Sequence, residues 1–447
     1  MRPTDHQISI RLFPRFTTHG RARSVALPRT NRIERVLLLL TIAVTPLLDT
    51  LPPLGEFSMA WLWFAVIGAY VLFQRANAFE RTLLQPAFLA AYAFIATGVM
   101  MEVFHTNPDF RDLIRFIQTV GGAVIIATLC RDRQAMRSGL YGFLLLGGLL
   151  TAVLLATSYR DLRGANVKGF DQASRLRGDV YRSEGSEDLL RDLNRISFLC
   201  GLGAIVAMGF AAKLRRSRLL WFGMTIVMLL GALLPLSRSG VLIVGLAGLA
   251  ILLSSSGRRL ESVLIAVLIV GCLYAIAPAA VFERFKTLDE RPGTSDPRQV
   301  IFKGVLEALP EFWLAGVGTS EYWSGWAVKQ GIATRAHKPL GAHNSFFQVW
   351  IYWGLPGLLT FLALLYVLWR CLPNGRRRDV LALCLFGLTL ALLIRLSFSH
   401  VFFVKDFAAV TGLLAGGHLW IWPSHATRTS VRVFHQVPRS TARQSLS

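Results

Sequence analysis

Long apolar stretches separated by short charged segments run through the whole chain. The twelve stretches are residues 36–48, 57–73, 83–101, 113–130, 138–158, 196–212, 219–236, 240–253, 262–282, 346–369, 380–398 and 407–422. About 20 apolar residues cross a bilayer as a helix, because every backbone polar group must be bonded within the segment. The pattern therefore predicts an all-α polytopic membrane protein with about twelve transmembrane helices, of which the first, eighth and last are the shortest.

Two of the segments between these stretches are long, 159–195 and 283–345. In the second, Asp296 is a candidate helix cap and Pro297 a candidate first helical residue, followed by an amphipathic pattern as far as Pro310. This pattern predicts a short helix that could lie on the membrane surface. Because long loops of this kind tend to carry function, we expect the chemistry in a large, partly helical loop.

Composition agrees with a membrane protein, since 53% of the residues are hydrophobic and the mean hydropathy is +0.48. The net charge of +22 is uneven along the chain. If the stretches alternate across a bilayer, the segments on one side carry 27 of the 48 basic and six of the 26 acidic residues. They are 1–35, 74–82, 131–137, 213–218, 257–261, 370–379 and 423–447.

Short basic loops face the cytoplasm, so this distribution predicts cytoplasmic termini and periplasmic loops at 159–195 and 283–345. The chain then divides into a basic cytoplasmic tail (1–35), a transmembrane domain (36–422) and a second basic cytoplasmic tail (423–447). Nucleic acid is not an expected partner, because binding it would not require basic residues distributed among short inter-helix loops.

Several kinds of chemistry find no support in the sequence. The five cysteines all lie within or at the ends of the apolar stretches, and the HExxH, GxSxG, Walker A and Asp-x-Asp patterns are missing. Asp49 and Glu56 could hold a metal near the outer end of the first stretch, but we prefer to interpret them as ordinary polar residues at a helix end. We therefore expect neither a metal nor a cofactor.

Two places combine polar chemistry with the outer end of an apolar stretch. Arg238 lies between two serines in "LSRSG", where its guanidinium either binds a phosphate or extends to the interface. His343 either bonds a neighbouring carbonyl or acts as a general base. Asn344 could orient it or bind a sugar, and His337 and Lys338 could share its role or be solvated loop residues.

Three motifs in order resemble the core of the O-antigen ligase and O-antigen polymerase superfamily. They are "SRSG" at the start of a stretch, "VLEALPEFWLAGVGTSEYW" in the long loop, and "HNSFFQVWIYWGLPGLL" at its end, covering about residues 230–370. The resemblance implies metal-independent glycan transfer at the periplasmic face of the bacterial inner membrane. It also implies a donor glycan on undecaprenyl pyrophosphate and, in ligases, a hydroxyl of lipid A–core as acceptor.

The resemblance also implies roles for particular residues. His343 would be the general base that activates the acceptor hydroxyl, and Arg238 would bind the donor pyrophosphate. The second arginine of the family lies in the large loop, where Arg298 is our choice because a helix N-terminus binds anions, with Arg284 and Arg291 left open. Attack opposite the pyrophosphate would invert the anomeric centre.

Three alternatives to an O-antigen ligase stay open. Within the superfamily they are a polymerase of O-antigen or exopolysaccharide, whose acceptor is another lipid-linked glycan, and a protein O-oligosaccharyltransferase. A secondary transporter is the alternative from a different class, and it should carry charged residues near the middle of its helices. Here the candidate residues Arg238 and His343 lie at the outer ends of stretches instead. Arg395 and His418 are the two exceptions that we assign to neither arrangement.

Overall fold

The computed structural model describes residues 30–48, 58–105, 108–165, 192–255, 259–286, 297–319, 342–373, 379–399 and 405–422, and the single positions 172, 176, 180 and 328. Helix accounts for nearly all of these residues, and no strand occurs among them. The predicted all-α class is therefore confirmed. The two basic tails, up to residue 29 and from residue 423, lie outside the described residues, as do Asp49 and Glu56.

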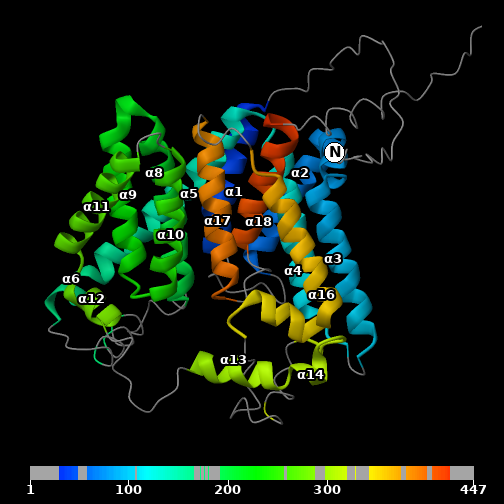
Figure 1. Ribbon diagram of the computed structural model, residues 1–447. Helices are drawn as coiled ribbons and strands as arrows, with labels where there is room; N and C mark the ends of the chain where they lie inside the picture. Colours follow the sequence, from blue (N-terminus) through cyan, green and yellow to red (C-terminus); the bar gives the residue numbers. More distant parts are fainter. Residues whose placement is uncertain are drawn as a thin grey trace, which may run out of the picture. The chain divides into compact units, whose positions relative to one another are not determined.

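Each of the twelve apolar stretches corresponds to one principal helix (Figure 1). They are α1 (Arg32–Leu48), α2 (Met59–Leu83), α3 (Pro86–Val103), α4 (Arg111–Leu129), α5 (Arg133–Thr157), α8 (Leu193–Lys213), α9 (Arg218–Leu233), α10 (Arg238–Ser255), α11 (Arg259–Ile276), α16 (Ser345–Arg370), α17 (Val380–Leu396) and α18 (Lys405–Gly416). Within the described residues, seven are long and apolar enough to cross a membrane, namely α2, α3, α4, α5, α8, α10 and α16. The total of about twelve crossings stays a prediction.

Shorter helices lie between these or follow them. They are α6 (Tyr159–Gly164), a 3-10 turn (Arg215–Ser217), α12 (Ala279–Lys286), α13 (Pro297–Glu307), α14 (Leu309–Phe312) and a π-helical turn (Gly417–Ile421). The expected helix between Asp296 and Pro310 is thus present as α13, and α14 follows it directly.

Two boundaries differ from those expected. Residues 74–82 form the end of α2 instead of a loop, with a kink at Arg75, because no glycine or proline interrupts the helix-forming sequence before Pro86. The stretch 262–282 is divided into α11 and α12, since Pro278 has no backbone N–H to continue the first helix.

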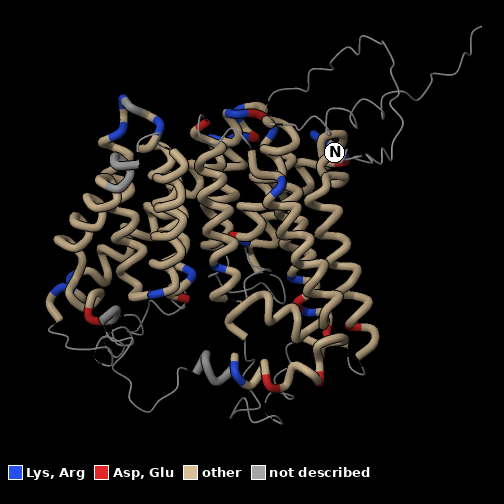
Figure 2. The backbone as a smooth tube through the Cα atoms, in the orientation of Figure 1, with Lys and Arg blue, Asp and Glu red and all other residues tan. Residues whose placement is uncertain are grey.

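Polar contacts join the segments at one end of the helices. Arg131 donates to Glu34 at 2.6 Å, Arg133 donates to Asp379 at 2.8 Å, and Lys213 donates to the carbonyl of residue 255 at 2.7 Å. These residues come from segments for which the charge pattern predicts one common side. Figure 2 shows Lys, Arg, Asp and Glu gathered toward the helix ends, leaving most of the middle stretches without charge. Which end faces the cytoplasm remains a prediction.

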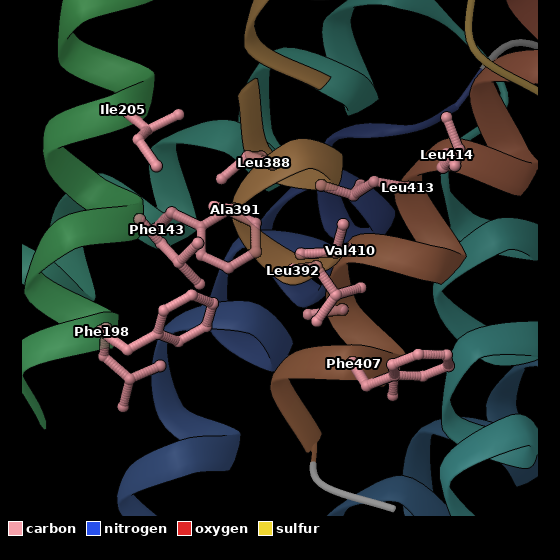
Figure 3. Packing of buried hydrophobic residues seen from close by; sticks show 14 of the residues in the cluster. Phe143, Phe198, Ile205, Leu388, Ala391, Leu392, Phe407, Val410, Leu413 and Leu414 are labelled. Atoms are coloured by element: carbon pink, nitrogen blue, oxygen red, sulfur yellow. The ribbon is translucent and has the colours of Figure 1, made fainter. Parts of the chain in front are cut away.

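The core is built from apolar side chains on helices that are distant in sequence (Figure 3). α8 packs against α5, α9, α10 and α17, while α4 packs against α18. Phe143 of α5, Phe198 of α8, Leu392 of α17 and Phe407 of α18 are all buried within this cluster. The packing of α8 and α17 matters for function, because both helices lead to the candidate site.

The first turn of α5 offers a test of acid stability. Asp132 accepts hydrogen bonds from Gln134 N, Ala135 N and Thr30 N at 2.8 to 2.9 Å. Burial alone would raise the pKa of Asp132, but these hydrogen bonds hold it below its usual value. A depressed carboxylate pKa stabilises the folded state above the unfolded value of about 3.9, and this contribution is lost as the pH falls through the folded pKa.

Asp132→Asn keeps a cap and removes the charge, so we expect a loss of at most about 1 kcal/mol at pH 7. Thermal unfolding of the two proteins in detergent, followed by fluorescence, measures the difference. It should be constant from pH 7 to 5 and shrink below about pH 4. A difference that grows on acidification would contradict this account.

Candidate active site

His343 stands immediately before the capped start of α16. The side chain of Asn344 is the helix cap, since its Oδ1 accepts from Phe346 N at 2.9 Å and from Phe347 N at 3.1 Å. His343 has a left-handed backbone with φ of +51°. Residues other than glycine adopt this conformation at a cost, and such residues cluster at functional sites.

The same turn is tied to the end of α17. The Asn344 amide nitrogen donates to Ser397 O at 3.1 Å, and the Ser345 hydroxyl donates to Ser399 O at 2.6 Å. Both ends of the Asn344 amide are therefore engaged within the protein, and its role toward His343 stays a prediction. The ties hold the backbone of His343 beside the segment that follows α17.

Arg238 begins α10 and also follows a left-handed turn. Leu236 has φ of +54°, and the Ser237 hydroxyl accepts from Gly240 N at 3.2 Å. A Cβ on Gly240 would lie 2.1 Å from the hydroxyl of Ser197, so the first turns of α10 and α8 are in close contact. Among the described residues, Leu236 and His343 are the two residues other than glycine with left-handed φ.

A buried charged cluster joins the starts of α8 and α18 to the end of α17. The guanidinium of Arg395 lies 4.1 Å from the ring centre of Phe198 and pairs with the buried carboxylate of Asp406. Arg195 lies 3.4 Å from the same carboxylate. Two positive groups around one acid compensate its burial, whereas an unpaired charge there would be costly.

A chain of contacts links the turn before Arg238 to the turn at His343. Arg238 is joined to α8 through Gly240, α8 is joined to α17 through Phe198, and α17 is joined to His343 through Asn344. The structure therefore brings Arg238 and His343 to the same end of the helices.

The second arginine of the predicted site lies on the long loop. Arg298 is in the first turn of α13, and its backbone is described while its side chain is not. One turn further on, the ring of Phe302 packs edge-on against Phe347 of α16, with ring centres 5.1 Å apart. Phe347 is itself one turn from His343. In Figure 1, α13 lies crosswise to the long helices at this end.

The other loop candidates are placed differently or not at all. Arg284 belongs to α12, which packs against α6, and its side chain is not described. Arg291, His337 and Lys338 lie outside the described residues. The choice of Arg298 over Arg284 and Arg291 stays a prediction.

α16 is broken between its first third and the remainder. Trp353 (φ −126°) and Gly354 (φ +60°, ψ −158°) have non-helical backbones. Gly354 occupies a region of backbone space that is essentially reserved for glycine. In Figure 1 the part of α16 before the break runs across the ends of neighbouring helices, and the part after it runs along them. Because of the break, the first turns of α16, which follow His343, run in a different direction from the rest of the helix.

A glycine turn of the long loop docks on this break. Val317 N donates to Ile351 O at 2.7 Å, Gly318 N to Tyr352 O at 3.1 Å, and Leu355 N to Trp313 O at 2.9 Å. These bonds satisfy backbone groups that a continuous helix would satisfy internally. Gly316 (φ +76°) approaches Tyr352 O so closely that a Cβ would lie 2.4 Å from it. Two of the recognised motifs therefore form one structural unit.

Sequence reasoning missed the charged cluster and left Arg395 without a place. Arg395 and Asp406 end one apolar stretch and begin the next, and this pairing of opposite charges across a short connection was the available signal. His418 lies in the π-helical turn Gly417–Ile421 near the other end of α18. Among the described residues, no group of three or more His, Cys, Asp or Glu is arranged to hold a metal ion.

Among the described residues, seven apolar helices of spanning length indicate an integral-membrane protein. Residues 223–362 match the family model described as O-Antigen ligase, a stretch that contains Arg238, α13, the glycine turn and His343. The match confirms the resemblance to the O-antigen ligase superfamily and indicates a membrane glycosyltransferase of the ligase or polymerase type. No curated protein matches the chain.

Proposed function

We propose that this protein is an inverting, metal-independent glycosyltransferase of the bacterial inner membrane. It transfers a glycan from undecaprenyl pyrophosphate to a hydroxyl of lipid A–core in lipopolysaccharide biosynthesis. One observation carries the proposal. The residues that match the O-antigen ligase family include the two left-handed turns, at Leu236 and at His343, and both turns lie at the same end of the helices. The charge pattern orients this end toward the periplasm and both termini toward the cytoplasm.

In the proposed reaction, the imidazole of His343 accepts the proton of the acceptor hydroxyl. The hydroxyl oxygen then forms a bond to the anomeric carbon of the donor, and the bond from that carbon to the pyrophosphate oxygen breaks. The leaving undecaprenyl pyrophosphate keeps the electron pair, and Arg238 and Arg298 bind its increased negative charge. Because the hydroxyl attacks opposite the leaving group, the anomeric configuration inverts.

The lipopolysaccharide pattern of a strain that lacks the gene tests the proposal and its alternatives within the superfamily. Lipid A–core without any O-chain is expected for a ligase, whereas core that carries a single repeat identifies a polymerase. Unchanged lipopolysaccharide together with loss of glycoprotein staining identifies a protein O-oligosaccharyltransferase. If lipopolysaccharide, exopolysaccharide and glycoproteins were all unchanged, the proposal would be overturned.

A secondary transporter is less well supported by the placement of charge. Arg395 is the penultimate residue of α17, Asp406 is the second residue of α18, and Arg195 is the third residue of α8. The cluster therefore lies at helix ends and not at the midpoints, where a transporter would hold its substrate or coupling ion.

Substitution of Arg238 provides a separate prediction. Arg238→Ala is expected to lower transfer about 10²- to 10³-fold, because a donor that stabilises the leaving charge is lost. Arg238→Lys should retain part of the activity, since a point charge replaces the forked guanidinium. Lipopolysaccharide banding, normalised to the amount of protein in the membrane, measures both variants.

Arg218→Ala is the matched control, because Arg218 begins α9 at the opposite end of the helix from the α9–α10 turn. It should leave transfer unchanged. Full transfer by a well-expressed Arg238→Ala protein would remove Arg238 from the proposed site.

A further inference from the structure

The break in α16 raises the question of what holds His343 in place. Helix continuity cannot do so, because Trp353 and Gly354 interrupt the helix between the first turns and the membrane-spanning part. The turns before the break are tied down at their start through Asn344 and Ser345. At the break itself the glycine turn holds the backbone, and a further attachment there involves the side chains of Tyr352 and Trp353.

Two carboxylates from other helices supply this attachment. The indole N–H of Trp353 donates to Glu102 Oε1 at 3.0 Å, and the hydroxyl of Tyr352 donates to Asp112 Oδ2 at 3.2 Å. Glu102 is near the end of α3 and Asp112 near the start of α4, and these four residues are at most 5% exposed. Buried hydrogen bonds to carboxylates are among the stronger ones and have a defined geometry.

The same carboxylates are connected to the long loop. Glu102 Oε2 accepts from Asp109 N at 3.2 Å, and Asp109 O accepts from the hydroxyl of Thr319 at 2.6 Å. Thr319 follows directly after the glycine turn that docks on the break. The connection between α3 and α4 therefore holds the break of α16 and the loop segment that follows α13.

We propose that Glu102 and Asp112 are positioning residues, which act through Trp353 and Tyr352 to fix the first turns of α16 and thereby the position of His343. This inference rests on the proposed function, because it requires His343 to be the base. A displacement of about 1 Å of a reacting group can lower a rate about 10²-fold. We call these four residues, Glu102, Asp112, Tyr352 and Trp353, the clamp. Loss of the clamp should lower kcat, while KM should stay the same because the substrate-binding groups are unchanged.

Two substitutions remove the hydrogen bonds, the first with little change of volume and the second with a smaller ring at the fully buried Trp353. Tyr352→Phe deletes one oxygen and should lower kcat about tenfold, and Tyr352→Phe with Trp353→Phe should lower it about 100-fold. KM should change less than about twofold, and the pH midpoint of kcat/KM should not move, since the base is the same group. The matched controls on the same helix are Tyr366→Phe and Trp369→Phe, which lie on the exposed face beyond the break.

The assay uses the full-length protein in proteoliposomes, with undecaprenyl-pyrophosphate-linked glycan and lipid A–core extracted from the same organism. Rates are divided by the amount of folded protein, measured by size-exclusion chromatography and thermal unfolding. Tyr352→Phe carries the test alone if the tryptophan variant does not fold. A merely structural role would lower the yield or melting temperature but leave kcat per folded molecule unchanged, and that result would overturn the proposal.

His343→Ala is included to separate the two levels of inference. If His343→Ala is inactive while folded Tyr352→Phe has the normal kcat, the clamp is wrong and the proposed base stands. If His343→Ala is fully active, the proposed base is wrong and with it the reason for the clamp.

Discussion

His343→Ala is expected to lower glycan transfer about 10²- to 10⁴-fold, the range that removal of a general base produces. The variant should fold, because Asn344 and Ser345 tie this turn to the residues that follow α17 and cap α16. Alanine must adopt the same left-handed φ, so a small loss of stability accompanies the substitution. Complementation of the deletion strain, with membrane protein levels checked, shows the effect in vivo.

His418→Ala is the matched control, because His418 lies in the π-helical turn near the other end of α18 and has no role in the proposed reaction. It should complement normally. Added imidazole should restore part of the activity of His343→Ala, as expected where a base has been removed. Normal lipopolysaccharide from a well-expressed His343→Ala protein would exclude His343 as the base.

Gly354→Ala is expected to be the most harmful of the glycine substitutions at this end. Its Cβ would lie 2.1 Å from Leu314 O, and its φ of +60° with ψ of −158° is unfavourable for alanine by about 1–3 kcal/mol before the clash is counted. Either the glycine turn must leave the break or α16 must straighten, and both change the position of His343. We expect a fall in transfer of about 10²-fold or more.

Gly245→Ala in α10 is the matched control, since a Cβ at that position would meet no atom within 4 Å. It should be active and unfold at the same or a higher temperature, because alanine favours a helix. Limited proteolysis of both variants gives an independent readout. The loop of Gly354→Ala should be cut faster than that of the control, and equal rates with normal transfer would show that the docking is dispensable.

Most of the helices were predictable, because an apolar segment long enough to cross a bilayer can be recognised from consecutive residues. The ends of the helices were harder to predict, as the end of α2 near Arg75 and the division of α11 from α12 at Pro278 show. Arg75 was placed in a loop because it is charged, yet it pairs with Glu34 of α1 at 2.5 Å and stays in a helix. Contacts between helices can thus override the local pattern of charge.

Some residues of the candidate site could likewise be predicted from the sequence, and others could not. His343, Arg238 and the glycine motifs could be found because each lies in a short recognisable string, and the O-antigen ligase match covers all of them. The partners of Tyr352 and Trp353 could not, since Asp112 and Glu102 are 240 and 251 residues away in sequence. The pairing of Arg395 with Asp406 differs, since these two charges lie only 11 residues apart in sequence and could have been noticed.

The docking of the glycine turn on the break of α16 sets a rule for exchanging parts between related proteins. Three backbone hydrogen bonds join residues 313–318 to residues 351–355, and they depend on shape more than on side-chain identity. A chimera that takes the loop from one relative and the histidine helix from another must preserve Gly316 and Gly354 as a complementary pair. The loop and the part of α16 before the break should then be exchanged together, while the remainder of α16 stays with the host protein.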